Sequence, residues 1–215
     1  MSGMIVWGVG TPRTLRVHWT LAELGLPYST RPIQSRTGET LTDEFTVLNQ
    51  RQKIPVLQDG EVTLTESAAI ITYLADRYGN SAASLVPLDA IERARCIQWC
   101  YFALSELDAT SLYVLRRHEG LPQIYGEAPA ANTAARRYFQ QQMRSVGPAL
   151  QDGREFVVAN SFSIADIMLC SCLTWAQALK IPIAAHVAQY NKRVTARPAY
   201  QAAVASNRIP GPDYS

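Results

Sequence analysis

The first residues that could do chemistry lie where a short apolar run meets glycines and then an amphipathic stretch. Residues 6–25 read VWGVGTPRTLRVHWTLAELG, so a strand should end near Trp7 and a helix should begin at Pro12. Such a junction directs free backbone N–H groups and the positive end of a helix dipole toward one point. The stretch Gly8–Arg13, which we call the glycine corner, is therefore a candidate site for an anion.

A dinucleotide pyrophosphate is the first anion to consider, because Gly8 and Gly10 begin a GxGxxG pattern. The position of the third glycine holds Arg13, and the pattern is a weak indicator without it. We therefore do not expect a dinucleotide, and the glycine corner binds another group or none.

A second candidate group is Glu66 with Ser67, at the start of the helical stretch SAAIITYLADRYG. Backbone N–H groups and the serine hydroxyl there can hold a carboxylate, while Glu66 can balance an ammonium. The alternative is structural, because serine is a common helix N-cap. The residues alone leave both interpretations open.

A third group, in the sequence NSFSIADI, favours a structural role. Ser163 as N-cap and Asp166 three residues later fit a capping box, with Phe162 and Ile167 placed as a hydrophobic staple. We therefore expect Asp166 to be a helix cap and not a catalytic carboxylate.

The composition excludes several classes of partner. The 215 residues, of which 47% are hydrophobic and 18% charged, suit one large or two small globular domains. A net charge of +2 gives no reason to expect nucleic acid or an anionic membrane. The N-terminus lacks a signal-peptide pattern, and the apolar stretches fall short of the roughly 20 residues of a membrane span. We expect a cytoplasmic protein.

The cysteines all lie in the second half of the chain, within apolar helical patterns, at Cys96, Cys100, Cys170 and Cys172. No CxxC or HxxxH pattern accompanies them. We therefore expect buried free thiols and no metal site.

The elements that position these residues change in type along the chain. Residues 4–79 alternate between strands, near 5–7, 28–33, 55–58 and 61–64, and helices at 12–24 and 67–79. Their order predicts a thioredoxin-like α/β domain over residues 1–79. Residues 80–88 read as a linker. Helices expected at 89–118, 131–151 and 164–179, with shorter ones after them, predict an all-α domain over 89–215.

Three features taken together resemble the cytosolic glutathione transferases. They are an α/β half that contains KIPVL and LTESAAIITYLADRYG, an all-helical half, and the SFSIAD box. The resemblance spans essentially the whole chain, and the order and spacing of the motifs make it specific. It implies a thioredoxin-like N-terminal domain, an all-α C-terminal domain, glutathione as co-substrate without a metal, and a homodimer.

The positions that the resemblance assigns to glutathione binding are Gln52, Lys53, Ile54, Pro55, Glu66 and Ser67. The first two match positions that reach the glycyl carboxylate. The next two match the residue whose main chain pairs with the cysteinyl backbone and the family's cis-proline, and the last two match the pair that binds the γ-glutamyl end. Lys53 carries the favourable charge, although it or Gln52 could instead face water.

The resemblance also implies that the anion at the glycine corner is a thiolate. A free thiol with a pKa of about 8.5 is mostly protonated at neutral pH, and a helix N-terminus or a cation lowers that pKa. Thr11 falls where many bacterial and insect members carry the serine or cysteine that faces the sulfur, and Arg13 could add positive charge. Thr11 and Pro12 equally fit a helix N-cap followed by proline. Catalytic and structural interpretations of Thr11 both stay open.

The residue types exclude some members of the family as close parallels. The N-terminal half has no cysteine, which excludes the mixed-disulfide mechanism of beta- and omega-like members, and the SSC stretch of maleylacetoacetate isomerase-like members is absent. A threonine at the thiol-facing position is similar to nu-class bacterial proteins, which tend toward glutathione disulfide reduction. Their asparagine two residues later is Arg13 here.

The second substrate, a small hydrophobic electrophile or a disulfide, is expected between the halves, over the first long helix of the second half. The expected lining is Trp99, Tyr101, Phe102, Ser105, Leu107 and Tyr113. Aromatic residues at helical spacing also occur in cores, so this set has a structural alternative.

The sequence thus predicts a glutathione transferase that stabilises the thiolate and promotes its attack on an electrophile or disulfide. A glutathione-dependent isomerase, dehalogenase or lyase would share the thiolate and differ in the second pocket. The alternative is a non-catalytic interaction or ligand-binding protein, since this fold does not guarantee chemistry.

Overall fold

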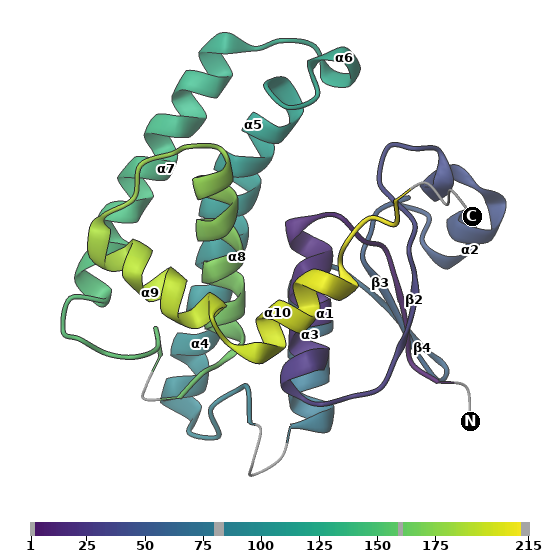
Figure 1. Cartoon of the computed structure of the whole chain (residues 1–215), viewed down its shortest axis with the longest axis horizontal. Coiled ribbons are helices and arrows are strands. Elements are labelled where there is room, and N and C mark those ends of the chain that lie inside the picture. The colour runs from purple at the N-terminus through teal and green to yellow at the C-terminus, as the bar shows by residue number, and fades with distance from the viewer. Residues whose placement is uncertain (1–2, 80–83, 159–160, 212–215) are drawn as a thin grey trace. The chain divides into compact units, whose positions relative to one another are not determined.

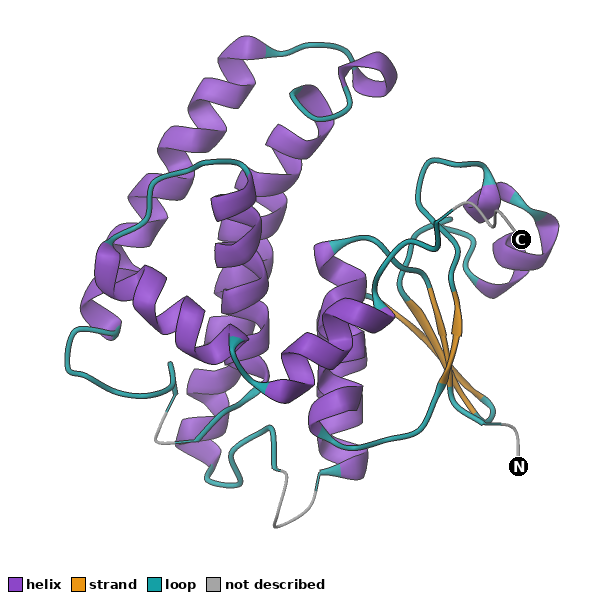
Figure 2. Cartoon of the chain, viewed as in Figure 1, coloured by secondary structure: helices purple, strands orange, loops and turns teal. Residues whose placement is uncertain are grey.

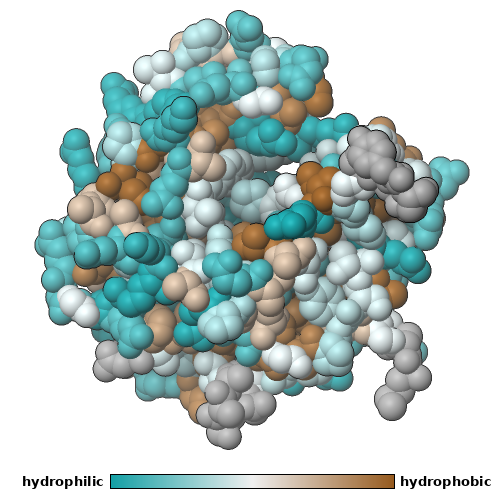
Figure 3. Space-filling view, in the orientation of Figure 1, coloured by the Kyte–Doolittle hydropathy of each residue, from teal (hydrophilic) through white to brown (hydrophobic). Residues whose placement is uncertain are grey.

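The computed structural model describes residues 3–79, 84–158 and 161–211. The chain divides into two compact units (Figure 1). The first unit is Met1–Val86 together with Ala196–Ser215, and the second unit is Pro87–Thr195. Hydrophilic side chains and smaller apolar groups alternate over the face shown in Figure 3. None of the helices in the described ranges is both long and apolar enough to cross a membrane.

The first unit is built on a mixed four-stranded sheet. Its strands are β1 (Ile5–Trp7), β2 (Ser29–Arg31), β3 (Val56–Asp59) and β4 (Val62–Thr65), in the order β2-β1-β3-β4. β1 runs parallel to β2 and antiparallel to β3, so that Val6 faces Thr30 on one side and Leu57 on the other. A parallel pair needs a crossover, which α1 (Pro12–Glu23) supplies. The predicted thioredoxin-like α/β domain is confirmed (Figure 2).

Helices of the first unit bury the apolar residues that the sequence placed on one face. α1 packs against α3 (Ser67–Tyr78) and α10 (Pro198–Ser206). Trp19 and Leu21 of α1, and Ile70, Ile71 and Leu74 of α3, are fully buried. The sequence predicted only a loop between β2 and β3, where the structure has a short turn of 3-10 helix, η1 (Glu39–Leu41), and α2 (Asp43–Leu48).

The second unit is all-helical and ends earlier than the sequence predicted. Its elements are α4 (Ala90–Phe102), η2 (Ala103–Leu112), α5 (Tyr113–His118), α6 (Pro122–Tyr125), α7 (Pro129–Ala149), α8 (Ile164–Ala178) and α9 (Ala185–Thr195). The predicted helical domain ran to residue 215, whereas α10 packs with the first unit. The predicted linker, 80–88, lies partly outside the described residues, and its Leu85 and Val86 are buried.

Two contacts explain why α10 belongs to the first unit. The rings of Trp19 and Tyr200 meet edge to face at 4.7 Å. Arg197 donates from Nε and Nη2 to the two carboxylate oxygens of Glu23, each at 2.7 Å. Such a fork-like pair is stronger than a single ion pair. These partners lie about 180 positions apart in the chain, so no local pattern could indicate them.

The predicted helix over 89–118 is continuous, but its centre is wider than an α-helix. η2 is π-helical, and the N–H of Tyr113 donates to the carbonyl of Asp108, five residues earlier. The buried line through this region is Cys96, Cys100, Ala103 and Leu107. Tyr101, which was expected either in the lining of a pocket or in the core, is 65% exposed. All four cysteines are buried and free, as predicted.

Candidate functional site

The glycine corner is tightly enclosed by two other segments of the first unit. Gly8 and Gly10 have φ values of 111° and 79°, which residues with side chains rarely adopt. A Cβ at Gly8 would lie 2.6 Å from Cβ of Ile54, and one at Gly10 would lie 2.6 Å from Cγ1 of Ile209. The two glycines therefore let the corner fit between the loop before β3 and the end of the chain.

The loop before β3 has the geometry that the family resemblance implies. The Ile54–Pro55 peptide is cis, and Ile54 packs with Phe45 and Val56 in a small buried cluster. The side chain of Gln52 donates to the hydroxyl of Thr46 at 3.1 Å, so it is held within the first unit. Lys53, in contrast, is exposed.

Glu66 and Ser67 lie at the end of β4, in an unusual backbone conformation. Glu66 has φ 68° and ψ 112°, a strained region for a residue with a side chain. Strain of this kind clusters at functional sites. Glu66 occupies the N-cap position of α3, and Ser67 is the first helical residue. The alternative in which Ser67 caps this helix therefore does not describe the structure.

Two arginines outside the predicted site contact this pair. Arg51 Nη1 lies 3.4 Å from Oε1 of Glu66, and its Nη2 bonds to the hydroxyl of Thr65. Arg16 of α1 is fully buried and donates from Nη1 to the Ser67 hydroxyl at 3.3 Å. The sequence signal for Arg16 was its position inside the apolar run LRVHW. A charged residue in such a run is expected to be buried, and a buried charge requires polar partners.

Thr11 is the N-cap of α1. Its hydroxyl oxygen accepts from the N–H of Thr14 at 3.0 Å, and the Thr11 N–H donates to the Thr14 hydroxyl at 3.1 Å. Pro12 follows at the first helical position. This is the capping geometry that the sequence allowed. Thr11 remains partly exposed, so the same hydroxyl can also meet a ligand.

His18 holds the glycine corner through a hydrogen bond to Gly8. It is fully buried, and its Nε2 lies 3.2 Å from the Gly8 carbonyl oxygen. A carbonyl only accepts, so Nε2 carries the proton and Nδ1 accepts from the hydroxyl of Tyr28 at 2.9 Å. Burial lowers the pKa of His18, against the opposing effect of the Gly8 bond. His18 therefore acts as a neutral donor.

Comparisons with known proteins identify this arrangement. Residues 2–76 match the family model described as Glutathione S-transferase, N-terminal domain. A theta-class glutathione S-transferase from Xanthomonas axonopodis pv. citri, solved with glutathione bound, matches 95% of this chain and 98% of its own, with a TM-score of 0.79 and 27% identity. These matches support the cytosolic glutathione transferase family for this chain.

Relatives of known sequence agree with that family. GstA of Escherichia coli O157:H7 is 27% identical over 202 residues, which are 91% of this chain and 94% of GstA. Glutathione S-transferase 2 of Anopheles gambiae is 34% identical over 139 residues, which are 65% of this chain and 63% of the mosquito protein.

The residues expected to line a second-substrate pocket differ in exposure. Trp99 packs edge-on against Phe102, with ring centroids 5.5 Å apart. Tyr101 and Ser105 are exposed, and the Ser105 hydroxyl donates to the Tyr101 carbonyl. Tyr113 is half-buried. Leu107, also expected in the lining, is fully buried and belongs to the core of the second unit.

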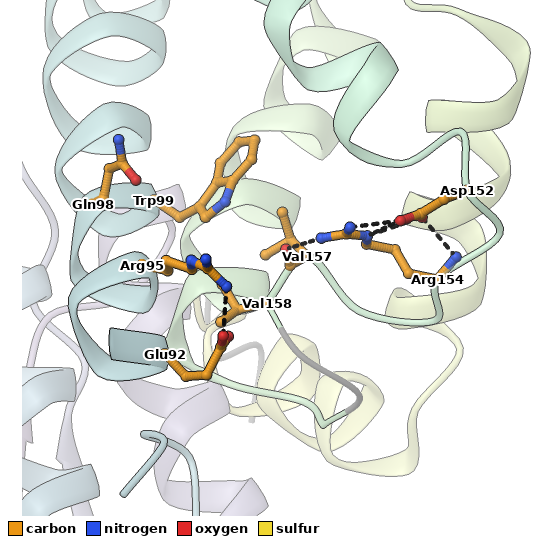
Figure 4. Close-up of a pocket in the computed structure, with 8 residues that line it drawn as sticks. All are labelled: Glu92, Arg95, Gln98, Trp99, Asp152, Arg154, Val157 and Val158. Carbon is orange, nitrogen blue, oxygen red and sulfur yellow. Dashed lines mark hydrogen bonds and ion pairs between the residues drawn. The ribbon is translucent and has the colours of Figure 1, made fainter. Parts of the chain in front are cut away.

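Trp99 does line a pocket of about 520 Å³ within the second unit (Figure 4). Glu92 and Arg95 of α4 pair across one side at 2.6 Å, while Asp152 and Arg154 pair at 2.5 Å in the loop after α7. The Arg154 guanidinium lowers the pKa of Asp152 to about 2. The charges of this pocket thus neutralise each other.

Ser163 and Asp166 form the capping box of α8. The Ser163 N–H and hydroxyl donate to one carboxylate oxygen of Asp166, at 2.9 and 3.1 Å. The other oxygen accepts from the Val157 N–H at 2.9 Å and from the Tyr190 hydroxyl at 2.6 Å. Burial raises the pKa of Asp166 in spite of these donors. The carboxylate joins α8, α9 and the loop before α8.

Proposed function

We propose that this chain is a glutathione transferase that binds reduced glutathione in the first unit and stabilises its thiolate. The thiolate would attack a small hydrophobic electrophile or a disulfide. The observation that carries this proposal is the Glu66–Ser67 pair, strained and braced by arginines, in the same unit as the cis Ile54–Pro55 loop and the glycine corner. The Xanthomonas relative, which was solved with glutathione bound, supports it.

Glutathione would be held along its length. The Ser67 hydroxyl and the first N–H groups of α3 would take the γ-glutamyl carboxylate, and Glu66 would take the ammonium. The main chain of Ile54 would pair with the cysteinyl backbone. Lys53, which is exposed, would meet the glycyl carboxylate, with Gln52 as a second donor.

The sulfur would lie at the glycine corner, where Thr11 is the proposed donor to the thiolate and Arg13 adds positive charge. A hydrogen bond to an anionic sulfur is stronger than one to a neutral hydroxyl. The Thr11 proton would therefore turn from Thr14 to the sulfur when the thiolate is present. The proton released from the thiol goes to solvent.

The second substrate would use the partly exposed aromatic residues of the helix from 90 to 118. The proposed lining is Trp99, Tyr101, Phe102, Ser105 and Tyr113. A cytoplasmic detoxifying homodimer is part of the same proposal. The exposed side chains of Leu88 and Ile91 supply apolar surface for contact with a second copy, which size-exclusion chromatography with light scattering would detect.

The decisive experiment is an ultraviolet difference titration of the bound glutathione thiol against pH. A thiol pKa well below the free value of about 8.5 would support thiolate stabilisation. Glu66→Ala should weaken glutathione binding at least tenfold, whereas Glu61→Ala, an exposed glutamate in the turn before β4, should leave binding unchanged. Arg13→Ala should raise the bound thiol pKa if Arg13 contributes charge.

A second candidate function is a non-catalytic ligand-binding or interaction protein. It is favoured by the Thr11 hydroxyl, whose bonds to Thr14 are those of a helix cap. Glutathione bound with an unshifted thiol pKa, or failure to bind glutathione at all, would support this candidate over the transferase.

A further inference from the structure

The segment after α10 binds the glycine corner through both the backbone and the side chain of one residue. Asn207, the residue after α10, accepts the Gly10 N–H at its backbone carbonyl at 2.9 Å and at its side-chain Oδ1 at 3.1 Å. Its Oδ1 also lies 2.6 Å from the Thr14 hydroxyl, and its Nδ2 lies 3.2 Å from the Thr11 carbonyl oxygen. All four residues belong to the first unit. One amide therefore binds three residues of the corner and of the first turn of α1.

Backbone partners fix the orientation of this amide. The Gly10 N–H can only donate, so the atom facing it is the amide oxygen. The Thr11 carbonyl can only accept, so the atom facing it is the amide nitrogen. The Thr14 hydroxyl, which faces the oxygen of Asn207, must then donate to it.

This orientation determines the direction of the hydroxyl pair. The Thr14 hydroxyl lies within hydrogen-bond distance of two acceptors, Oδ1 of Asn207 at 2.6 Å and the Thr11 carbonyl oxygen at 2.8 Å, and neither of them is the Thr11 hydroxyl. The Thr11 carbonyl also receives the Leu15 N–H at 3.0 Å and the Asn207 Nδ2, which together fill its two lone pairs. The single proton of the Thr14 hydroxyl therefore goes to Oδ1 of Asn207. In the contact of 2.9 Å between the two hydroxyls, Thr11 is then the donor. The Thr11 hydroxyl is therefore already a hydrogen-bond donor, and its proton can turn to a stronger acceptor.

We propose that Asn207 is a positioning residue, which clamps Gly10 and Thr11 so that the Thr11 hydroxyl is held as a donor toward the glutathione sulfur. This inference rests on the proposed function. Asn207 binds the main chain on both sides of the Gly10–Thr11 peptide. Without this contact, the glycine would leave the backbone free to rotate. It does not itself touch the sulfur.

Asn207→Asp is the sharpest test, because the carboxylate keeps the size of the side chain and its bonds to Gly10 and Thr14. The second oxygen would face the Thr11 carbonyl, which repels it, and the negative charge would oppose a thiolate. We expect the bound thiol pKa to rise by about one unit or more, which is a roughly tenfold fall in the ionisation constant of the thiol. Asn207→Ala, which only removes the clamp, should give a smaller rise and a lower kcat with little change in KM for glutathione.

Gln201→Glu is the matched control, because it adds the same charge on α10, about 9 Å along the helix axis at 1.5 Å per residue. Wild type should show a lowered thiol pKa that Asn207→Asp raises and Gln201→Glu does not. Equal pKa values in all three proteins, with glutathione still bound, would overturn the role of Asn207 and leave the transferase proposal intact. An unshifted thiol in wild type would overturn the transferase proposal itself, and the clamp with it. A melting curve for each variant verifies that the protein is folded.

Discussion

At the scale of single residues, the first unit gives several side chains two tasks. Thr11 caps α1 and is also the proposed donor to the sulfur. Arg16 is buried behind Ser67, and His18 is buried behind Gly8. Through these contacts, the charged Arg16 and the protonated Nε2 of His18 hold in place the residues that a ligand would contact. Substitutions here should therefore separate stability from thiol chemistry.

Thr11→Ala and Thr11→Ser distinguish these two tasks. The alanine variant loses both the cap, worth about 1 kcal/mol, and the hydroxyl proton, so it should melt earlier and raise the bound thiol pKa. The serine variant keeps both and should resemble wild type in calorimetry and in the thiol titration. A Thr11→Ala protein that melts earlier but keeps a lowered thiol pKa would make Thr11 a cap alone.

His18 makes the stability of the protein depend on pH. Its folded pKa lies below the unfolded value of about 6.5, so the unfolded state binds a proton that the folded state does not. The stabilising effect is complete above pH 6.5 and is lost as the pH falls below it. Denaturant titrations from pH 5 to 8 should show a smaller slope for His18→Gln than for wild type. His186→Gln is the control, and an unchanged slope in His18→Gln would contradict the assignment.

At the scale of elements, α8 is the centre of the second unit. Its residues 164–173 are all buried, and the capping box at its start joins it to α9 and to the preceding loop. The sequence motif SFSIAD indicated the box but not its two further donors, Val157 and Tyr190. Those donors come from segments that only the packing of the second unit brings together.

Asp166→Asn should destabilise the second unit by about 3 kcal/mol, because four donors lose a buried carboxylate partner. Urea denaturation followed by circular dichroism would measure this. Asp152→Asn removes an exposed carboxylate whose partner is Arg154 and should change the midpoint little. Equal effects of the two substitutions would show that burial is not what matters at Asp166.

At the scale of the whole molecule, the division into units does not follow chain order. α10 lies against α1 through Tyr200 and Arg197, so the last helix of the chain stabilises the unit that contains the first strand. This arrangement also brings Asn207 to the glycine corner. The N-terminal unit is therefore completed only by the C-terminal segment.

Tyr200→Ala should loosen α1 more than α8. Removing a buried aromatic side chain costs about 3 kcal/mol, and here the ring packs on Trp19. Hydrogen–deuterium exchange should become faster in residues 12–23, with little change in residues 164–178. Val204→Ala, at a partly exposed position of α10, serves as the control. Faster exchange in α8 and not in α1 would contradict the assignment of α10 to the first unit.

Local chemistry allowed the sequence to predict the four strands, α1 and α3 of the first unit and the cap sequence at Ser163 and Asp166, whereas the residues proposed to bind glutathione were assigned by the family resemblance. The elements and the cap rest on neighbours within a few positions: alternation in a strand, a hydroxyl before a helix. The place of α10 and the roles of Arg16, Arg51 and Asn207 rest on contacts between distant segments. A hydrogen bond such as that between Asn207 and Gly10 joins positions 197 apart, and nothing in either local sequence indicates the other. Only the tertiary structure decides those partners, because the burial of a side chain and the direction of its hydrogen bonds depend on the segments that fold against it.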